Sequence, residues 1–290
     1  MTRKERVRLD TDFRVCYHAD MDRRRKSELM EERTLEEMQK FYNEECDESQ
    51  RLMSQSGQIE FITTMQYLKL YCKKNMAVLD ACAGGGVYSF PLADLGCDVI
   101  AGDLIDRNVE HIRQKNEKEA KLKDIYQGSV LDLSRFQNDS FDVVLNLGSY
   151  YHLCDETERR ISLDETLRVL KHGGIYMIAY VNRCANYMAH FEELANDFSF
   201  LVDYMREGHI PNSTLFYSTM PEMIEQDLKE RHLKLLHNIA TDGPMFVYRD
   251  IVERMSKRDF EAFMNLHLEL CDQKSNLGYS EHGLVIAQKA

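Results

Sequence analysis

Short strand-like apolar runs alternate with helix-like stretches in the middle of the chain. The runs lie at residues 76–79, 99–101, 124–126, 143–145 and 175–181. One of the intervening stretches begins with capping residues from Asp155 onward, and we expect Gly173 and Gly174 to end that helix. Strands that alternate with helices predict a parallel sheet that is covered by helices on both faces.

The segments on either side of this alternation have mostly helical patterns. Residues 20–55 are rich in Glu, Arg, Lys and Met, and apolar side chains recur at helical spacing over residues 57–73. Residues 187–205 predict a helical insertion, which fits either a local core or a lid over a pocket. Farther along, the pattern predicts a strand, a helix and a last strand, at 232–240, 247–272 and 283–289.

Composition and charge narrow the class of protein. The chain has 290 residues, of which 43% are hydrophobic and 30% are charged. This is typical of a globular protein with one large or two small domains. The 37 Lys and Arg residues against 49 Asp and Glu give a net charge of −12. Such a chain repels phosphate backbones, so we expect no generic nucleic-acid binding, although a local basic groove near the run at 23–26 stays open.

The cysteines and the N-terminus indicate the compartment. None of the eight cysteines forms a CxxC pair, so we expect neither a zinc site nor a disulfide framework. The charged N-terminal residues are not followed by an apolar core, and no apolar run approaches the roughly 18 residues of a membrane span. We therefore expect a cytoplasmic protein with reduced thiols and no membrane association.

The strongest chemical signal is the stretch VLDACAGGGVY at residues 78–88. It is a strand that runs into a glycine-rich turn, where a ligand can approach the backbone closely. The next strand ends in Asp103, seventeen residues after Gly86, where a carboxylate can accept the hydroxyls of a ribose. The GxGxxG fingerprint of NAD-binding proteins is absent, because Cys82 and Ser89 each break one of its two possible registers.

These motifs resemble those of the class I S-adenosylmethionine-dependent methyltransferases, across residues 60–182. The family's first motif is two hydrophobic residues followed by Asp-x-Gly-x-Gly-x-Gly. Asp80, Gly84 and Gly86 match it, while Cys82 replaces its first glycine. Asp103 matches the acidic residue after the second strand. The family's later motifs are the segment after the third strand that contacts adenine, the fourth strand, and the turn before the fifth strand. They read GSVLDL, FDVVL and KHGG, at 128–133, 141–145 and 171–174.

A closer resemblance is to small bacterial methyltransferases in which the fourth strand leads into Leu-Gly-x-x-Tyr-His-Leu. Here that segment reads LGSYYHL at residues 147–153. The same group is similar at residues 51–52, 60–61 and 278–284. The likeness therefore extends over most of the chain apart from about the first 35 residues, and it does not settle which molecule is methylated.

The resemblance implies the fold class α/β, with a Rossmann-like methyltransferase fold. It implies a mostly parallel seven-stranded sheet, an antiparallel last strand at 284–289 and a helical cap. We expect residues 1–56 to form an N-terminal helical extension or cap. Residues 57–290 would form the methyltransferase domain, with 183–230 as a helical cap insertion.

The resemblance also implies S-adenosylmethionine as cofactor, S-adenosylhomocysteine as product, and no metal. The residues expected to bind the cofactor are Arg51, Asp80, Ala81, Gly84, Gly85, Gly86, Asp103, Leu104, Ser129, Val130, Leu131, Asp132 and Leu147. Structural alternatives stay open for several of them. Asp80 can cap its turn, Asp132 can begin a turn, and Arg51 can be a surface residue as well as a fork-shaped donor to the cofactor's carboxylate. Tyr42 and Tyr88 are weaker candidates.

His152 and Tyr151 are the candidate catalytic residues. They follow the fourth strand, on the side where the methyl group of the cofactor should point. A histidine there can take a proton from the acceptor, and the alternative is a histidine that bonds the backbone. Tyr151, like Tyr150, is expected to shape the pocket. His267 and His282 are weaker candidates for the role of base.

The sequence thus predicts methyl transfer from S-adenosylmethionine to a small-molecule acceptor, by a monomer or a dimer. One alternative is methylation of a protein or RNA, and another is a protein that binds the cofactor or its product without turnover. The Asn/Asp-Pro-Pro-Tyr/Phe motif of nucleic-acid amino-group methyltransferases is absent, because Asn146 is followed by Leu147 and Gly148. An enclosed aromatic cap would favour the small molecule, whereas an open groove beside residues 23–26 would favour a polymer. A site without a polar group on the acceptor side would favour the non-enzyme.

Overall fold

A computed structural model describes residues 36–42, 52–194, 198–209 and 215–290. The chain divides into two units, Met1–Cys46 and Asp47–Ala290. The described part of the first unit is a short helix at 36–42, in which the rings of Phe41 and Tyr42 meet edge to face with their centroids 5.2 Å apart. Arg51 and the basic run at 23–26 lie outside the described residues.

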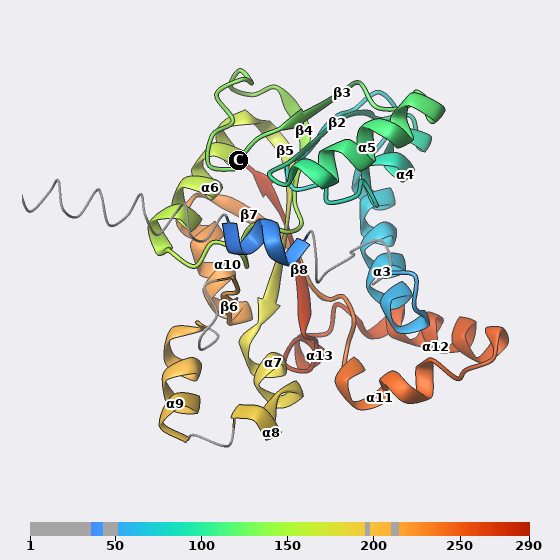
Figure 1. Ribbon diagram of the computed structural model, residues 1–290, viewed down its shortest axis with the longest axis vertical. Coiled ribbons are helices and arrows are strands. Elements are labelled where there is room, and N and C mark those ends of the chain that lie inside the picture. Colours follow the sequence, from blue (N-terminus) through green and yellow to red (C-terminus); the bar gives the residue numbers. More distant parts are fainter. Residues whose placement is uncertain (1–35, 43–51, 195–197, 210–214) are drawn as a thin grey trace, which may run out of the picture. The chain divides into compact units, whose positions relative to one another are not determined.

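One mixed sheet forms the centre of the second unit (Figure 1). Its strand order is β3-β2-β1-β4-β5-β8-β7, and β8 is antiparallel to both of its neighbours whereas the other neighbouring pairs are parallel. The strands are β1 Ala77–Asp80, β2 Asp98–Asp103, β3 Asp124–Gln127, β4 Phe141–Asn146, β5 Leu170–Asn182, β6 Ser218–Thr219, β7 Leu233–Ala240 and β8 His282–Lys289. The short β6 pairs with β5 off this path, so the described sheet has eight strands where seven were expected. The mostly parallel α/β fold with an antiparallel last strand is confirmed.

Helices cover both faces of this sheet (Figure 1). They are α3 Gln55–Tyr71, α4 Ser89–Asp94, α5 Asp106–Glu119, α6 Glu156–Val169, α7 Arg183–Ala189, α8 Phe191–Leu194, α9 Phe198–Glu207, α10 Pro221–Glu230, α11 Met245–Val252, α12 Lys257–Leu270 and α13 Lys274–Leu277. Because successive strand residues point to opposite faces, Val143 and Leu145 of β4 pack with α3, α4 and α5, whereas Val144 packs with α6 and α10. The sheet thus lies between two buried apolar clusters.

The start of α6 is as expected, but its end is not. The Asp155 carboxylate caps the helix by accepting from the backbone N–H of Thr157 at 2.7 Å. The helix ends at Val169, and Gly173 and Gly174 lie inside β5. The prediction that these glycines end the helix is therefore wrong. They lie where the β4–β5 register shifts, and a Cβ on Gly174 would come within 3.0 Å of the Asp142 carbonyl oxygen.

The helix expected over 247–272 is two helices, α11 and α12. The break follows from a new cap, because Ser256 Oγ accepts from the backbone N–H of Asp259 and starts α12. The expected insertion after β5 contains the short helices α7, α8 and α9. By contrast, α10 packs against β7 and buries Ile224 and Leu228 in the core, so it belongs to the sheet layers.

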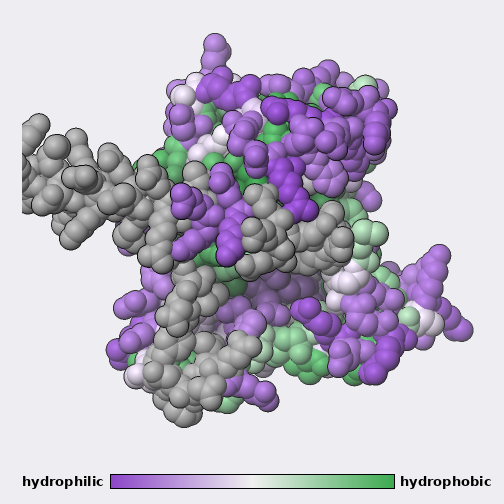
Figure 2. Space-filling model, viewed as in Figure 1, coloured by the Kyte–Doolittle hydropathy of each residue, from purple (hydrophilic) through white to green (hydrophobic). Residues whose placement is uncertain are grey.

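On the face shown in Figure 2, the described residues are mostly hydrophilic. Hydrophobic residues gather over α11, where Val247, Tyr248 and Ile251 are exposed. Within the described ranges, no helix combines the length and apolar character that a membrane crossing requires.

Candidate active site

The glycine-rich turn follows β1 and leads into α4. Gly84 and Gly86 have φ angles of +53° and +78°, which L side chains rarely adopt. A Cβ on Gly86 would lie 2.9 Å from the Phe90 ring, whereas a Cβ on Gly84 would meet nothing within 4 Å. Gly86 therefore serves the packing of α4, while Gly84 leaves open space. Cys82 does not have a positive φ, which explains why this loop tolerates a side chain in place of the first motif glycine.

Asp103, at the end of β2, is bonded to the same turn. Its carboxylate accepts from the backbone N–H groups of Gly84 at 2.7 Å and Ile105 at 2.9 Å, and from the Asn108 side chain at 3.1 Å. Burial raises the pKa of this carboxyl, while those hydrogen bonds lower it. The next residue, Leu104, accepts from the Gln127 side chain through its backbone carbonyl. Asp103 thus links the end of β2 to the glycine turn.

Asp80, the last residue of β1, is a buried carboxylate with one unsatisfied oxygen. Only 1% of the residue is exposed, and Oδ2 accepts from Ser89 Oγ at 2.6 Å. Oδ1 has no hydrogen-bond partner among the described residues. Burial raises the pKa of Asp80 to about 7 although the Ser89 bond lowers it. A cationic group bound beside the turn would satisfy this oxygen and offset the cost of burying the charge.

The segment after β3 divides into buried and exposed positions. Val130 is buried and Leu131 is partly buried against the same cluster. Ser129 Oγ accepts from the backbone N–H of Leu131 at 3.1 Å. Asp132 is exposed and accepts from the backbone N–H of Ser134 at 3.0 Å, which is the turn geometry left open as its alternative. Ala81 is buried, with its N–H donated to Leu145 of β4.

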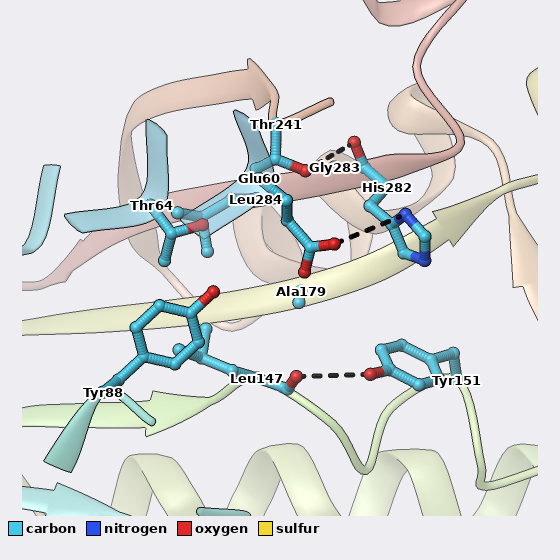
Figure 3. A pocket seen from close by; sticks show the side chains of 10 residues that line it. All are labelled: Glu60, Thr64, Tyr88, Leu147, Tyr151, Ala179, Thr241, His282, Gly283 and Leu284. Carbon is cyan, nitrogen blue, oxygen red and sulfur yellow. Dashed lines mark hydrogen bonds and ion pairs between the residues drawn. The ribbon is translucent and has the colours of Figure 1, made fainter. Parts of the chain in front are cut away.

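A pocket opens at the carboxyl edge of the parallel strands, beside the glycine turn (Figure 3). Its lining comes from α3, the residues after the turn, the ends of β4 and β7, β5 and the start of β8. The lining residues are Glu60, Thr64, Tyr88, Leu147, Tyr151, Ala179, Thr241, His282, Gly283 and Leu284. Of the predicted site residues, Leu147 and Tyr151 line it, and the Tyr151 hydroxyl donates to the Leu147 carbonyl at 3.4 Å.

His152 lies outside this lining. It is buried, its Nδ1 is 2.8 Å from the Leu215 carbonyl oxygen, and its ring centroid is 4.8 Å from those of both Tyr151 and Phe216. Burial lowers the pKa of His152 to about 4, more than the Leu215 bond raises it. These contacts fit the structural alternative rather than a base that faces an acceptor. His267 is also buried and outside this lining.

His282, a histidine that does line the pocket, was only a weak candidate from the sequence. His282 Nδ1 lies 2.8 Å from Asp242 Oδ2 and 3.9 Å from Glu60 Oε2. Sequence reasoning did not select Asp242 or Glu60 as site residues. The motif at 278–284 pointed to the region of His282, but nothing in the sequence linked it to an aspartate forty residues earlier.

Comparison with known proteins agrees with this geometry. Residues 79–178 match a family model described as a methyltransferase domain, and this range holds the glycine turn, Asp103 and β4. The matched domain, the curated relatives and the shared fold support a class I S-adenosylmethionine-dependent methyltransferase. S-adenosylmethionine is the cofactor of this family.

Two curated relatives of this methyltransferase are named ubiquinone biosynthesis O-methyltransferase. The protein of Roseobacter denitrificans is 30% identical over 110 residues, which cover 38% of this chain and 43% of the relative. The protein of Chelativorans sp. is 26% identical over 190 residues, which cover 65% of this chain and 69% of the relative. The first of these alignments therefore spans less than half of the relative's length.

Solved structures share the fold of this methyltransferase. A SAM-dependent methyltransferase from Methanosarcina mazei has a TM-score of 0.52 at 16% identity, covering 77% of this chain and 96% of the other. One from Aquifex aeolicus has a TM-score of 0.51 at 14% identity, with coverages of 85% and 100%. The [4+2]-cyclase SpnF has a TM-score of 0.51 at 16% identity, covering 79% and 81%. Since a protein named a cyclase shares the fold, the reaction has to be argued from the site.

Proposed function

We propose that this protein transfers a methyl group from S-adenosylmethionine to a small-molecule acceptor in the pocket of Figure 3. The observation that carries the proposal is the position of the pocket. Tyr88, two residues after Gly86, lines it on one side, and Leu147, the residue after β4, lines it on another. In open parallel sheets, ligands bind outside the carboxyl ends of the strands, so a cofactor at the turn and an acceptor in the pocket would be neighbours.

The residues around the turn suit the two polar ends of the cofactor. The unsatisfied Asp80 Oδ1 fits an ammonium group, and the Asp103 carboxylate, which is held by three donors, fits a ribose diol. Gly84 leaves room for a close approach to the backbone. When bound, the cofactor supplies an activated methyl group on its sulfonium. The protein's own contribution is to hold the acceptor in line with that group and to exclude water.

The charge of the pocket lining bears on the acceptor. Within the described part of the chain, the ten lining residues include Glu60 and His282 but no lysine or arginine. An acceptor that carries a phosphate or a carboxylate would find no counter-charge there, so a neutral or cationic small molecule fits better. The names of the curated relatives, which are O-methyltransferases of ubiquinone biosynthesis, support a small organic acceptor.

A variant that fills the pocket tests the proposal. Ala179→Phe places a ring into the pocket from β5, while Val202→Phe adds the same ring at an exposed position on α9. Calorimetry with S-adenosylhomocysteine should show binding to the wild type and to both variants within about threefold. Product release from S-adenosylmethionine, screened with phenols, amines, thiols and total RNA, should fall by at least about tenfold in Ala179→Phe only.

Three results would refute this assignment. If the wild-type protein does not bind S-adenosylhomocysteine, the cofactor assignment is wrong. If turnover requires RNA or protein, the small-molecule acceptor is wrong. Cofactor binding without turnover on extracted metabolites would favour the non-catalytic alternative.

A further inference from the structure

We propose that His282 and Asp242 form a general-base pair in this pocket and that the methyl acceptor reacts through a hydroxyl group. This inference rests on the proposed function, because it names the acceptor chemistry and the proton acceptor of that same reaction. The reasons are the fixed geometry of Asp242, the charges around the imidazole, and the proton that a hydroxyl must lose.

Asp242 is held in place by its own hydrogen bonds. Oδ1 accepts from Ser280 Oγ at 2.5 Å and from the backbone N–H of His282 at 3.2 Å, which leaves Oδ2 directed at His282 Nδ1, 2.8 Å away. Ser280 Oγ in turn accepts from the backbone N–H of Gly243 at 2.9 Å. The Asp242 side chain is only 10% exposed. A carboxylate fixed in this way keeps a proton on Nδ1, so that Nε2 is the nitrogen that takes up a second proton.

The charges around the imidazole favour its protonated form. Glu60 reaches it from α3, with Oε2 3.9 Å from Nδ1, and Figure 3 shows this carboxylate pointing at the ring across the pocket. The adjacent Glu281 has its pKa raised by burial and by the charge of Asp242, while the charges of His282, His190 and Arg249 lower that pKa. Among the described groups, the carboxylates of Glu60 on α3 and of Asp242 after β7 thus face the ring. The charge of Asp242 also raises the pKa of His267 on α12, although burial lowers that pKa.

The chemistry balances with no further reactant. The acceptor oxygen forms a bond to the methyl carbon, and the carbon–sulfur bond breaks with its electron pair going to sulfur. The hydroxyl proton moves to His282 Nε2. Positive charge thus leaves the sulfonium and appears on the imidazole, where Asp242 and Glu60 stabilise it. The His282 side chain is 34% exposed, so the proton can afterwards pass to water.

A hydroxyl is the acceptor that gains most from this arrangement. A phenolic hydroxyl titrates near pH 10, so at neutral pH its proton has to be removed during transfer. A thiol is partly ionised already, and a neutral amine attacks with its lone pair before it loses a proton. Neither needs a base in the transition state to the same degree. The O-methyltransferase names of the curated relatives agree with this choice.

Asp242→Asn tests the pair with little change of shape. The amide can keep the Oδ1 contacts to Ser280 and to the His282 backbone, but it presents an NH₂ group to Nδ1 and so forces the proton onto Nε2. With catechol as the probe acceptor, kcat at pH 7 should fall about 10²–10⁴-fold in Asp242→Asn and His282→Gln. The loss should shrink toward pH 10, where the phenol ionises by itself. The affinity for S-adenosylhomocysteine should stay within about threefold.

His172→Ala is the matched control, since His172 is exposed near the opposite end of β5 and bonds the backbone carbonyl of Ala290. Its kcat and pH profile should equal those of the wild type. The result that would overturn the base pair is a wild type that methylates catechol while His282→Gln retains its kcat and its pH profile. A wild type that binds no S-adenosylhomocysteine would instead refute the proposed function.

A second measurement does not depend on the acceptor. Imidazole ¹⁵N NMR of the S-adenosylhomocysteine complex should show His282 protonated at Nδ1 in the wild type and at Nε2 in Asp242→Asn. Exchange of the product for S-adenosylmethionine at constant pH should move the imidazole ¹⁵N signals of His282 toward the neutral form, because the sulfonium is a nearby positive charge. The same tautomer in both proteins, or identical signals in both complexes, would overturn the inference.

Discussion

Replacing Asp80 by Asn tests whether the glycine turn keeps a buried carboxylate for a cation. Asp80 is 1% exposed, Oδ2 accepts from Ser89 at 2.6 Å, and Oδ1 has no partner in the described ranges. Burial raises the pKa of this carboxyl from 3.8 to about 7. Asparagine has nearly the same shape and can still accept from Ser89, but it never ionises. The difference in the free energy of unfolding between wild type and Asp80→Asn therefore measures the cost of burying the charge.

The sign and size of the effect follow from that pKa. Between pH 4 and pH 7 the unfolded chain loses the Asp80 proton while the folded chain keeps it, so the free energy of unfolding falls as pH rises. A difference of about three pH units at 1.36 kcal/mol each gives an upper limit of about 4 kcal/mol, reached above pH 7. Burial also raises the pKa of Asp103, which acts with the same sign. The quantity to measure is therefore the difference between wild type and variant.

Urea unfolding at pH 4, 5, 6, 7 and 8, followed by circular dichroism, measures this difference. Asp80→Asn should be more stable than the wild type by an amount that grows with pH and levels off above pH 7. Calorimetry should show the opposite order for the cofactor product, with wild-type affinity rising through pH 7 and the variant binding at least about tenfold more weakly at pH 8. A stability difference that does not change with pH, or a variant less stable at pH 8, would refute the reasoning.

Three further substitutions have defined outcomes. Asp103→Ala should weaken binding of S-adenosylhomocysteine about 10- to 100-fold in calorimetry, because a charged hydrogen bond contributes roughly 1.5–3 kcal/mol; unchanged affinity in a folded variant would contradict its ribose role. Gly102→Ala places a Cβ 2.1 Å from the Tyr126 ring and should lower the unfolding free energy by about 1–3 kcal/mol in urea melts. His152→Ala should also lower the free energy of unfolding by about 1–3 kcal/mol, while the pH profile of methyl transfer stays unchanged. A changed pH profile would indicate that His152 is the base after all.

The fold was predictable where the signals were local. Strands that are buried on both faces appear as continuous apolar runs, and the run at 143–145 lies within the observed β4. Element ends were less predictable, because tertiary contacts decide them. Gly173 and Gly174 are compatible with a helix end, yet pairing of β5 with β4 takes them into a strand. The apolar pattern over 247–272 continues through Ser256, where a side-chain cap divides it into two helices.

The cofactor side of the site could be predicted from local sequence, whereas the acceptor side could not. Asp80, Gly84 and Gly86 stand within seven residues of one another, so a single strand and its turn carry most of the cofactor motif. The acceptor side is assembled from α3, the ends of β4 and β7 and the start of β8, and no local pattern connects these segments. His152 was selected because it follows β4 directly, but the burial of its ring against Leu215 depends on a segment sixty-three residues away.

The register of β8 explains how the acceptor side comes together. An antiparallel strand begins at the edge where its parallel neighbours end, so its first residues lie beside their last ones. Val181 near the end of β5 pairs with His282, and Ala240, the last residue of β7, pairs with Gly283. Asp242 follows two residues later and so lies beside His282. A Cβ on Gly283 would lie 2.2 Å from the Tyr180 ring, so glycine is required at this point. A slip of β8 by two residues would preserve the alternation of its faces but would separate His282 from Asp242. The close contact between Gly283 and the Tyr180 ring therefore fixes the geometry of the proposed base pair as well as the packing of the sheet.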